Sequence, residues 1–246
     1  LVDGLVRIKP LVARVAELGM PAVAITDQSN LFSLVKFYKA SIAAGIKPIS
    51  GVDVWIRDPE DANNPFRLLL LVQNPKGYKN LTCLISRSYR EGQHLGKAMI
   101  EPDWLTPQSC EGLIALSGGR TGDIGRALMA ENRSEAEKRL GHWLALFGDR
   151  FYLELQRTGR EGDERALHAT VDLAADLDVP VVATNDVRFL NREDFEAHEV
   201  RVCIHEGRTL DDSRRPKHFS PEQYLRTPEE IGSTRLNSSH VAISYA

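Results

Sequence analysis

The sequence predicts an α/β fold of the TIM-barrel type, and three observations indicate it. Short apolar runs of strand length alternate with longer segments of helical period, and glycine or proline separates the two kinds. More than six such units follow one another, which favours a barrel over an open sheet. The chain has 246 residues, enough for one barrel, and no low-complexity linker divides it.

The first half of the chain predicts three strand and helix alternations. Apolar residues recur on one helical face in each helix, and two of the helices end at Gly19 and Gly45. Helices are predicted over 9–18, 30–45 and 77–92, and strands over 21–26, 47–56 and 67–74.

The second half repeats the alternation. Strands are predicted over 112–118, 150–156 and 180–185, and helices over 123–132, 134–148, 161–178 and 192–207. Ser134 and Glu137 have the spacing of a capping box, which places a helix start at Ser134.

Composition excludes several classes of protein. A net charge of -3 gives no broad electrostatic reason to expect tight binding to nucleic acid. Cys83, Cys110 and Cys203 lie far apart, which fits a reducing cytoplasm and neither a disulfide framework nor a zinc ribbon. The longest apolar run, 68–72, is too short to span a bilayer, so no membrane association is expected.

Polar residues gather where the predicted strands end. They are Asp27, Asp53, Ser117, Asn185 and Asp186. In a barrel these positions converge on one face, and converging carboxylates repel one another unless a cation lies between them. A single aspartate at a strand end is more often a turn or helix-capping residue, and Asp27 suits that role.

Histidine is the usual partner of such carboxylates in a metal site. His142, His168 and His198 fall within predicted helices, where packing or surface roles are expected. His94, in a predicted loop, is the best lone candidate ligand, and none of these histidines directly follows a strand.

Four stretches of this chain together resemble one known family. Residues 19–56, 77–86, 112–128 and 179–212 are similar to the polymerase and histidinol phosphatase (PHP) domain, in the form found at the N-terminus of the bacterial DNA polymerase III alpha subunit. The resemblance runs from about Leu1 to about Glu230. It implies a distorted (β/α)7 barrel whose strand ends bind a cluster of divalent metals in active members of the family.

The metal-ligand positions that the resemblance implies are only partly kept. The family's His-x-His would precede residue 1, together with the first barrel strand. The remnant ligand positions are Asp3, Asp53 and Asp186, which we expect to be unoccupied. The positions where the family's histidine, cysteine and histidine have been replaced are Gln28, Gly119 and Arg188.

Arg188 decides the functional interpretation. Arginine keeps its proton in proteins and cannot bind a cation as a ligand. Two residues after Asp186, its charge is placed to neutralise the remaining carboxylates. The sequence therefore suggests that a salt-bridged cluster replaces the metal cluster, and no cofactor is expected in this chain.

The resemblance implies a non-catalytic domain that supports the polymerase and docks the proofreading exonuclease (epsilon) subunit. The rest of the alpha subunit would be its other partner and would contact DNA. The parent polymerase would use Mg²⁺ at palm carboxylates, and no palm motif is present here, so the chain alone is not expected to polymerise DNA. The alternative is an active phosphoesterase or 3'-5' exonuclease that uses Zn²⁺ or Mn²⁺.

The last part of the chain differs from the rest in sequence. Residues 1–232 are expected to form the PHP domain fragment, whereas 233–246 resemble a translated sequencing adapter more than a serine-rich native tail. The basic residues Arg214, Arg215 and Lys217 suggest either a nucleic-acid contact or, preferably, a solvated turn leading into a helix capped by Ser220.

Overall fold

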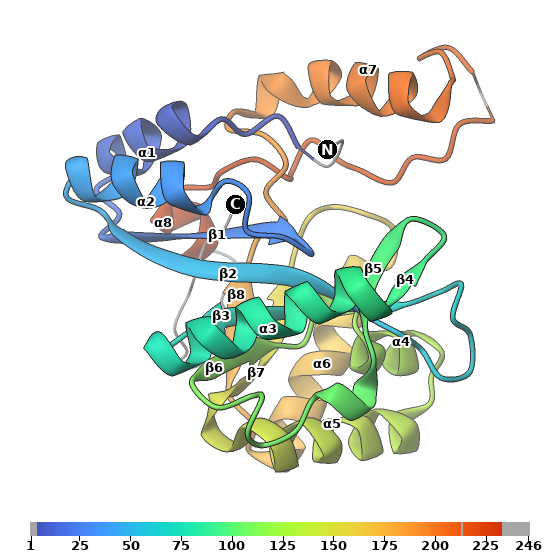
Figure 1. Cartoon of the computed structure of the whole chain (residues 1–246). Helices are drawn as coiled ribbons and strands as arrows, with labels where there is room; N and C mark the ends of the chain where they lie inside the picture. Colours follow the sequence, from blue (N-terminus) through green and yellow to red (C-terminus); the bar gives the residue numbers. More distant parts are fainter. Residues whose placement is uncertain (1–3, 213, 233–246) are drawn as a thin grey trace.

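The computed structural model describes residues 4–212 and 214–232, and the strands among them form one mixed sheet (Figure 1). The strands pair in the order β4-β5-β2-β3-β6-β7-β8, and β1 pairs with β2. Their bounds are β1 Ala22–Gln28, β2 Lys47–Ile56, β3 Phe66–Val72, β4 Gln93–His94, β5 Lys97–Ile100, β6 Leu113–Leu116, β7 Phe151–Gln156 and β8 Val181–Thr184.

The directions of the strands determine which strand ends lie together at one edge of the sheet, which we call the functional edge. The pairs β1–β2, β6–β7 and β7–β8 are parallel, whereas β3 is antiparallel to both β2 and β6. The carboxyl ends of β1, β2, β6, β7 and β8 therefore lie at one edge, together with the amino end of β3. The predicted α/β fold is confirmed. No pairing between β1 and β8 is present in the described part of the chain, so the sheet is open, as in a distorted barrel.

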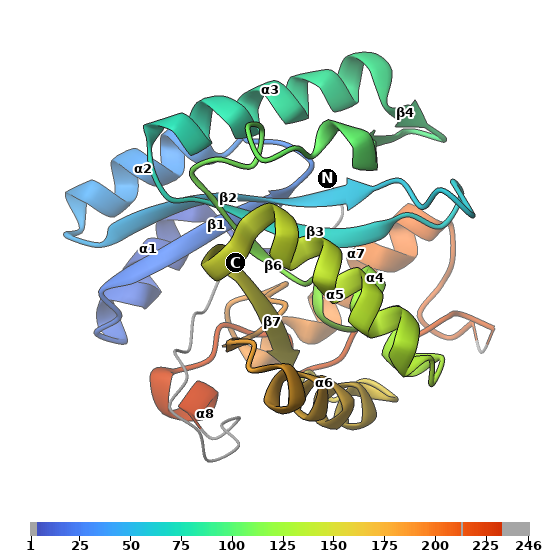
Figure 2. The same cartoon turned by 90° about the horizontal axis from the view of Figure 1, so that it is seen from below.

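The helices cover the sheet in groups. Helices α1 and α2 pack together beside β1, and α3 runs along β3 and β5, while α4, α5 and α6 form a layer next to β6 and β7 (Figures 1 and 2). The bounds are α1 Ile8–Glu17, α2 Leu34–Ala43, α3 Pro75–Glu91, α4 Asp123–Met129, α5 Arg133–Phe147, α6 Asp163–Leu177, α7 Phe195–Glu206 and α8 Pro228–Gly232.

Asparagine side chains begin two of the longer helices. Asn74 accepts a hydrogen bond from the backbone N–H of Gly77 at the start of α3, and Pro75 occupies the first helical position. Asn132 accepts from the N–H of Glu135 at the start of α5. The predicted cap at Ser134 was therefore wrong, because the helix begins one residue earlier and Asn132 supplies the cap.

Two main groups of buried apolar side chains hold the helices to the sheet. One joins β2, β3, β6 and β7 to the helices α3 to α6 and includes Leu68, Trp143 and Phe151. The other joins α1 and α2 to β1 and includes Leu11 and Phe37, both fully buried. Burial of this kind contributes roughly 25 cal/mol per Å² of apolar area, so both groups stabilise the packing of the helices against the sheet.

The segment that follows α7 returns to the edge of the sheet. The amide of Asn185, directly after β8, donates to the backbone carbonyls of Glu222 and Tyr224, and Phe189 forms a β-bridge with Tyr224. The predicted helix after Ser220 was wrong, because this hydroxyl donates to the Thr158 carbonyl and the chain continues as turns.

Other expectations fall outside what the structure describes. The tail, 233–246, and the first barrel strand expected before residue 1 both lie outside the described residues. None of the described helices is long and apolar enough to cross a membrane.

Candidate functional site

Two of the three predicted remnant ligands come together at the functional edge. Asp53 lies near the end of β2 and Asp186 lies two residues after β8, and both are buried. Arg67 joins them, because its Nη2 atom donates to Asp53 Oδ2 and lies 3.7 Å from Asp186 Oδ1. Asp3, the third predicted ligand, lies outside the described residues.

Three arginines converge on Asp186. Arg188 Nη2 donates to Asp186 Oδ1 at 2.8 Å, and Arg160 Nη1 lies 3.7 Å from Oδ2. Arg67 completes the set, and the side-chain amide of Gln223 also donates to Oδ2, at 3.0 Å. We call Asp53, Asp186, Arg67, Arg160 and Arg188 the arginine cluster.

The charges of the arginine cluster control the protonation of its carboxylates. Burial acts to raise the pKa of Asp186, but the combined charges of Arg188, Arg67 and Arg160 outweigh it and hold this pKa well below its usual range. For Asp53, burial is the larger effect, and its pKa is raised although Arg67 is bonded to it. Asp186 is therefore the anion around which the arginines are arranged.

The residues at the replaced ligand positions make contacts of other kinds. Gln28 donates its amide to the Asp53 backbone carbonyl at 2.8 Å, away from the carboxylate. Gly119 has a φ of +55°, and a Cβ there would lie 2.8 Å from the side-chain oxygen of Gln156, so a larger residue would have to displace this side chain. Arg188, the third replaced position, belongs to the arginine cluster.

The remaining strand-end candidates have structural roles. Asp27 accepts hydrogen bonds from the backbone and hydroxyl of Ser33, so it holds the turn before α2, although the N-cap residue of this helix is Ser33. The Ser117 hydroxyl accepts from the Glu154 N–H at 2.9 Å. His94 lies in β4, where its ring contacts Asn63 Oδ1 at 2.8 Å. None of these side chains forms part of the arginine cluster.

Among the basic residues after α7, some are exposed to solvent and one is buried. Arg215 pairs with buried Glu199 at 2.5 Å, whereas Arg214 is exposed and pairs with Asp212 at 3.1 Å. Lys217 lines a cavity beside the arginine cluster. The preferred interpretation, a wholly solvated turn, was therefore too simple for Arg215.

Sequence reasoning missed Arg67 and Arg160. Arg67 lies at the amino end of β3, and only an antiparallel strand brings an amino end to this edge. Arg160 lies in the loop between β7 and α6, where a basic residue usually indicates a solvated surface. The available signal was that Arg67 directly precedes the apolar run 68–72. To place this arginine at the correct edge of the sheet, one would also have needed to know the direction of β3.

The residues present do not fit a divalent metal cluster. Guanidinium groups occupy the space next to both carboxylates, and a guanidinium neither loses its proton nor offers a lone pair to a metal. In the described part of the chain, no group of three or more histidine, cysteine, aspartate or glutamate side chains is arranged to hold a metal ion.

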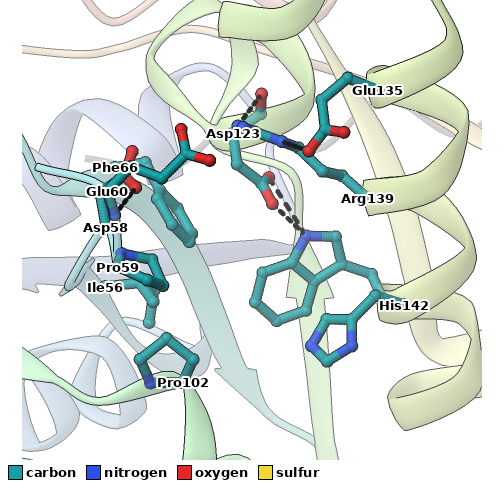
Figure 3. A pocket seen from close by; sticks show the side chains of 11 residues that line it. Ile56, Asp58, Pro59, Glu60, Phe66, Pro102, Asp123, Glu135, Arg139 and His142 are labelled. Carbon is teal, nitrogen blue, oxygen red and sulfur yellow. Dashed lines mark hydrogen bonds and ion pairs between the residues drawn. The ribbon is translucent and has the colours of Figure 1, made fainter.

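A second cavity lies between the β2–β3 connection and α5, with a volume of about 230 Å³ (Figure 3). Its most buried acid, Asp123, accepts hydrogen bonds from the Trp143 indole at 2.9 and 3.1 Å and from the Ile124 N–H at 2.8 Å. Burial raises the pKa of Asp123. Because these donors already engage its carboxylate, we assign Asp123 a structural role and place the functional site at the arginine cluster.

Comparison with known proteins shows the family of this chain. The family model described as "PHP domain" matches residues 1–158. The chain belongs to the PHP domain family.

The sequence relatives of this PHP domain are longer proteins. The chain is 58% identical over 231 residues to DNA polymerase III subunit alpha of Pseudomonas aeruginosa and 49% identical to that of Escherichia coli K12. Each match covers 94% of this chain and 20% of the relative, so the PHP domain chain spans about a fifth of the length of the curated relatives it matches.

A solved structure shares the fold of this PHP domain. It is a proposed metal-dependent phosphoesterase from Bifidobacterium adolescentis, with a TM-score of 0.52 and 13% sequence identity, and the match covers 74% of this chain and 82% of that one. At this identity the likeness concerns the fold alone.

Proposed function

We propose that this chain is a non-catalytic PHP domain of a cytoplasmic bacterial replicative polymerase. In this role it supports the rest of the alpha subunit and docks the proofreading exonuclease subunit. The observation that carries the proposal is the contact of Asp186 with Arg67, Arg160 and Arg188, which puts positive charge where active relatives would need a cation. DNA contacts and Mg²⁺-dependent nucleotide transfer belong, in this proposal, to the remainder of the polymerase.

The metal content of the purified chain tests the non-catalytic part. After dialysis against metal-free buffer, we expect far less than one equivalent of zinc or manganese by mass spectrometry, because three guanidinium groups repel a cation at Asp186. We also expect no hydrolysis of p-nitrophenyl phosphate or of a 3'-labelled oligonucleotide when Mn²⁺ is added. The Bifidobacterium protein, prepared in parallel, provides the comparison sample. Stoichiometric metal together with metal-dependent hydrolysis would instead support the active phosphoesterase or exonuclease.

An exposed apolar stripe on α2 supports the docking part. Four large apolar side chains at helical spacing have exposed fractions between 53% and 77%; three lie on α2 and one lies two residues before its first residue. They are Phe32, Val35, Tyr38 and Ile42. Contiguous apolar surface of this kind is uncommon on a monomeric protein and is typical of a protein interface.

Binding to the exonuclease subunit tests the docking role. We expect the chain to form a complex with the Pseudomonas aeruginosa exonuclease subunit, and Val35→Ser with Ile42→Ser to weaken it about tenfold, since the two changes remove apolar area from the interface. Affinity would be measured by calorimetry. Leu177→Ser, at an exposed apolar residue on α6, is the control and should leave the affinity unchanged. No complex with the unchanged chain would contradict the docking role.

A further inference from the structure

The cavity between the β2–β3 connection and α5 has apolar walls that face each other (Figure 3). One side is formed by Ile56, Pro59, Phe66 and Pro102, His142 lies across from them, and Trp143 also lines the cavity. The volume of about 230 Å³ is smaller than the roughly 300 Å³ at which sites for whole drug-sized ligands begin. The cavity can therefore take a group of the size of one side chain.

More carboxylates than cations line this cavity. Its acidic residues are Asp58, Glu60, Asp123 and Glu135, and among the described residues Arg139 is the one arginine or lysine of the lining. Arg139 donates to Glu135 at 2.9 Å, so these two charges neutralise each other. The other three acids remain to be balanced from outside the lining.

The cations outside the lining are engaged elsewhere. Arg126 interacts electrostatically with Asp58 and Asp123, but its guanidinium donates to two backbone carbonyls of the β2–β3 connection. Lys138 approaches Glu135 at 3.5 Å, and its side chain is 79% exposed, so solvent screens its charge. Arg57 is paired with Glu101 at 2.6 Å.

The β2–β3 connection carries the excess of negative charge. Asp58, Glu60 and Asp61 lie within four residues of one another, and in the described part of the chain none of the three forms an ion pair. With Asp61, five carboxylates stand against Arg126, Lys138 and Arg139, which leaves two negative charges. One remains where Asp123 carries a proton, since burial raises its pKa. A cation is therefore the ligand that the charge of this cavity favours.

We propose that this cavity binds an alkylguanidinium group. A guanidinium is planar, stacks on aromatic faces and donates hydrogen bonds to carboxylates in a fixed geometry. The rings of Phe66 and Trp143 offer surfaces for stacking, and Asp58 and Glu60 offer acceptor oxygens. An ammonium group is more strongly hydrated and does not stack, so apolar walls suit it less well. The group belongs either to an arginine side chain of a partner protein or to a free alkylguanidine.

A nuclear magnetic resonance titration that follows the ligand signals tests the proposal, with 1-propylguanidinium as the probe. We expect this cation to bind, and 1-propylurea, which has nearly the same shape and no charge, not to bind. Asp58→Asn with Glu60→Gln should weaken binding at least about fivefold. The amide oxygen keeps an acceptor for the Glu60 N–H, which Asp58 now binds, so the fold should survive, and thermal melting checks this.

The matched control is Asp172→Asn with Glu196→Gln. It removes the same charge from exposed sites on α6 and α7, and it should change the affinity by less than about twofold. The proposal would be overturned by the absence of 1-propylguanidinium binding at millimolar concentration, by equal binding of 1-propylurea, or by equal weakening in the control.

A second arm of the experiment separates the two sources of the group. Binding of N-acetylarginine N-methylamide that is tighter than that of 1-propylguanidinium would assign the site to an arginine of a partner protein, whereas equal or weaker binding would assign it to a free alkylguanidine. The inference goes beyond the proposed function. Within the described residues this cavity shares no lining residue with the cavity beside the arginine cluster, so metal content measured on the same samples distinguishes the two failures.

Discussion

Replacement of Asp186 by alanine is expected to lower the free energy of unfolding by about 3 to 5 kcal/mol, the usual cost of removing one partner from a buried ion pair. Asp186 is 4% exposed, and its loss leaves Arg67, Arg160 and Arg188 facing one another without their shared anion. Urea denaturation followed by circular dichroism measures the change.

A matched variant shows whether burial is the reason. Asp176 also pairs with an arginine, Arg133, at 2.7 Å, but its side chain is 67% exposed. Asp176→Ala should therefore cost less than about 1 kcal/mol. If Asp186→Ala cost no more than Asp176→Ala, the arginines would not depend on Asp186.

The same site predicts a dependence on pH. The pKa of Asp186 is held below its ordinary value of 3.8, so the carboxylate contributes stability that is fully present above pH 3.8 and is lost as the pH falls through the lower folded-state pKa. The difference in stability between the unchanged chain and Asp186→Asn should therefore be constant near neutral pH and shrink below pH 3.8. A difference that grew on acidification would contradict this assignment of charge.

Replacement of Trp143 by alanine is expected to cost about 3 to 5 kcal/mol, as for other large aromatic side chains in a core. Trp143 is 2% exposed and its ring lies 6.3 Å from that of Phe66 and 6.2 Å from that of Phe151. Its indole N–H also satisfies buried Asp123. Urea denaturation again gives the change.

A double-mutant cycle separates the packing of Trp143 from its hydrogen bond. Trp143→Phe keeps a ring but removes the donor to Asp123, and should cost about 1 to 3 kcal/mol for the unsatisfied acid. In an Asp123→Ala background the same change should cost much less, because no buried carboxylate remains to be satisfied. An unchanged cost in that background would assign the whole effect to packing.

Much of the fold was predictable because apolar period and turn residues are local signals. Asp53 and Asp186 were also predictable as neighbours, since each follows the course of a strand to the same edge of a sheet. Arg67 was not, because its place depends on the reversed direction of β3, which no residue near it indicates.

Local capping patterns were less reliable than strand and helix periods. Ser134 has a suitable glutamate three residues later, but Asn132 lies at the position where the chain enters the helix, and its side chain accepts the capping hydrogen bond. Ser220 has a suitable polar sequence after it, but its hydroxyl is directed to the Thr158 carbonyl by tertiary contacts. In both cases the three-dimensional course of the chain determined which acceptor or donor was available.

The arginine cluster also affects how the domain is made in the cell. A barrel that is held together by metal ions must be loaded after synthesis, and its folded fraction then follows the supply of those ions. Here the positive charges at Asp53 and Asp186 are carried by Arg67, Arg160 and Arg188, which are synthesised with the chain. Every copy of the chain therefore carries the arginines that neutralise its own buried carboxylates. Metal starvation should consequently leave the folding of this edge of the sheet unchanged.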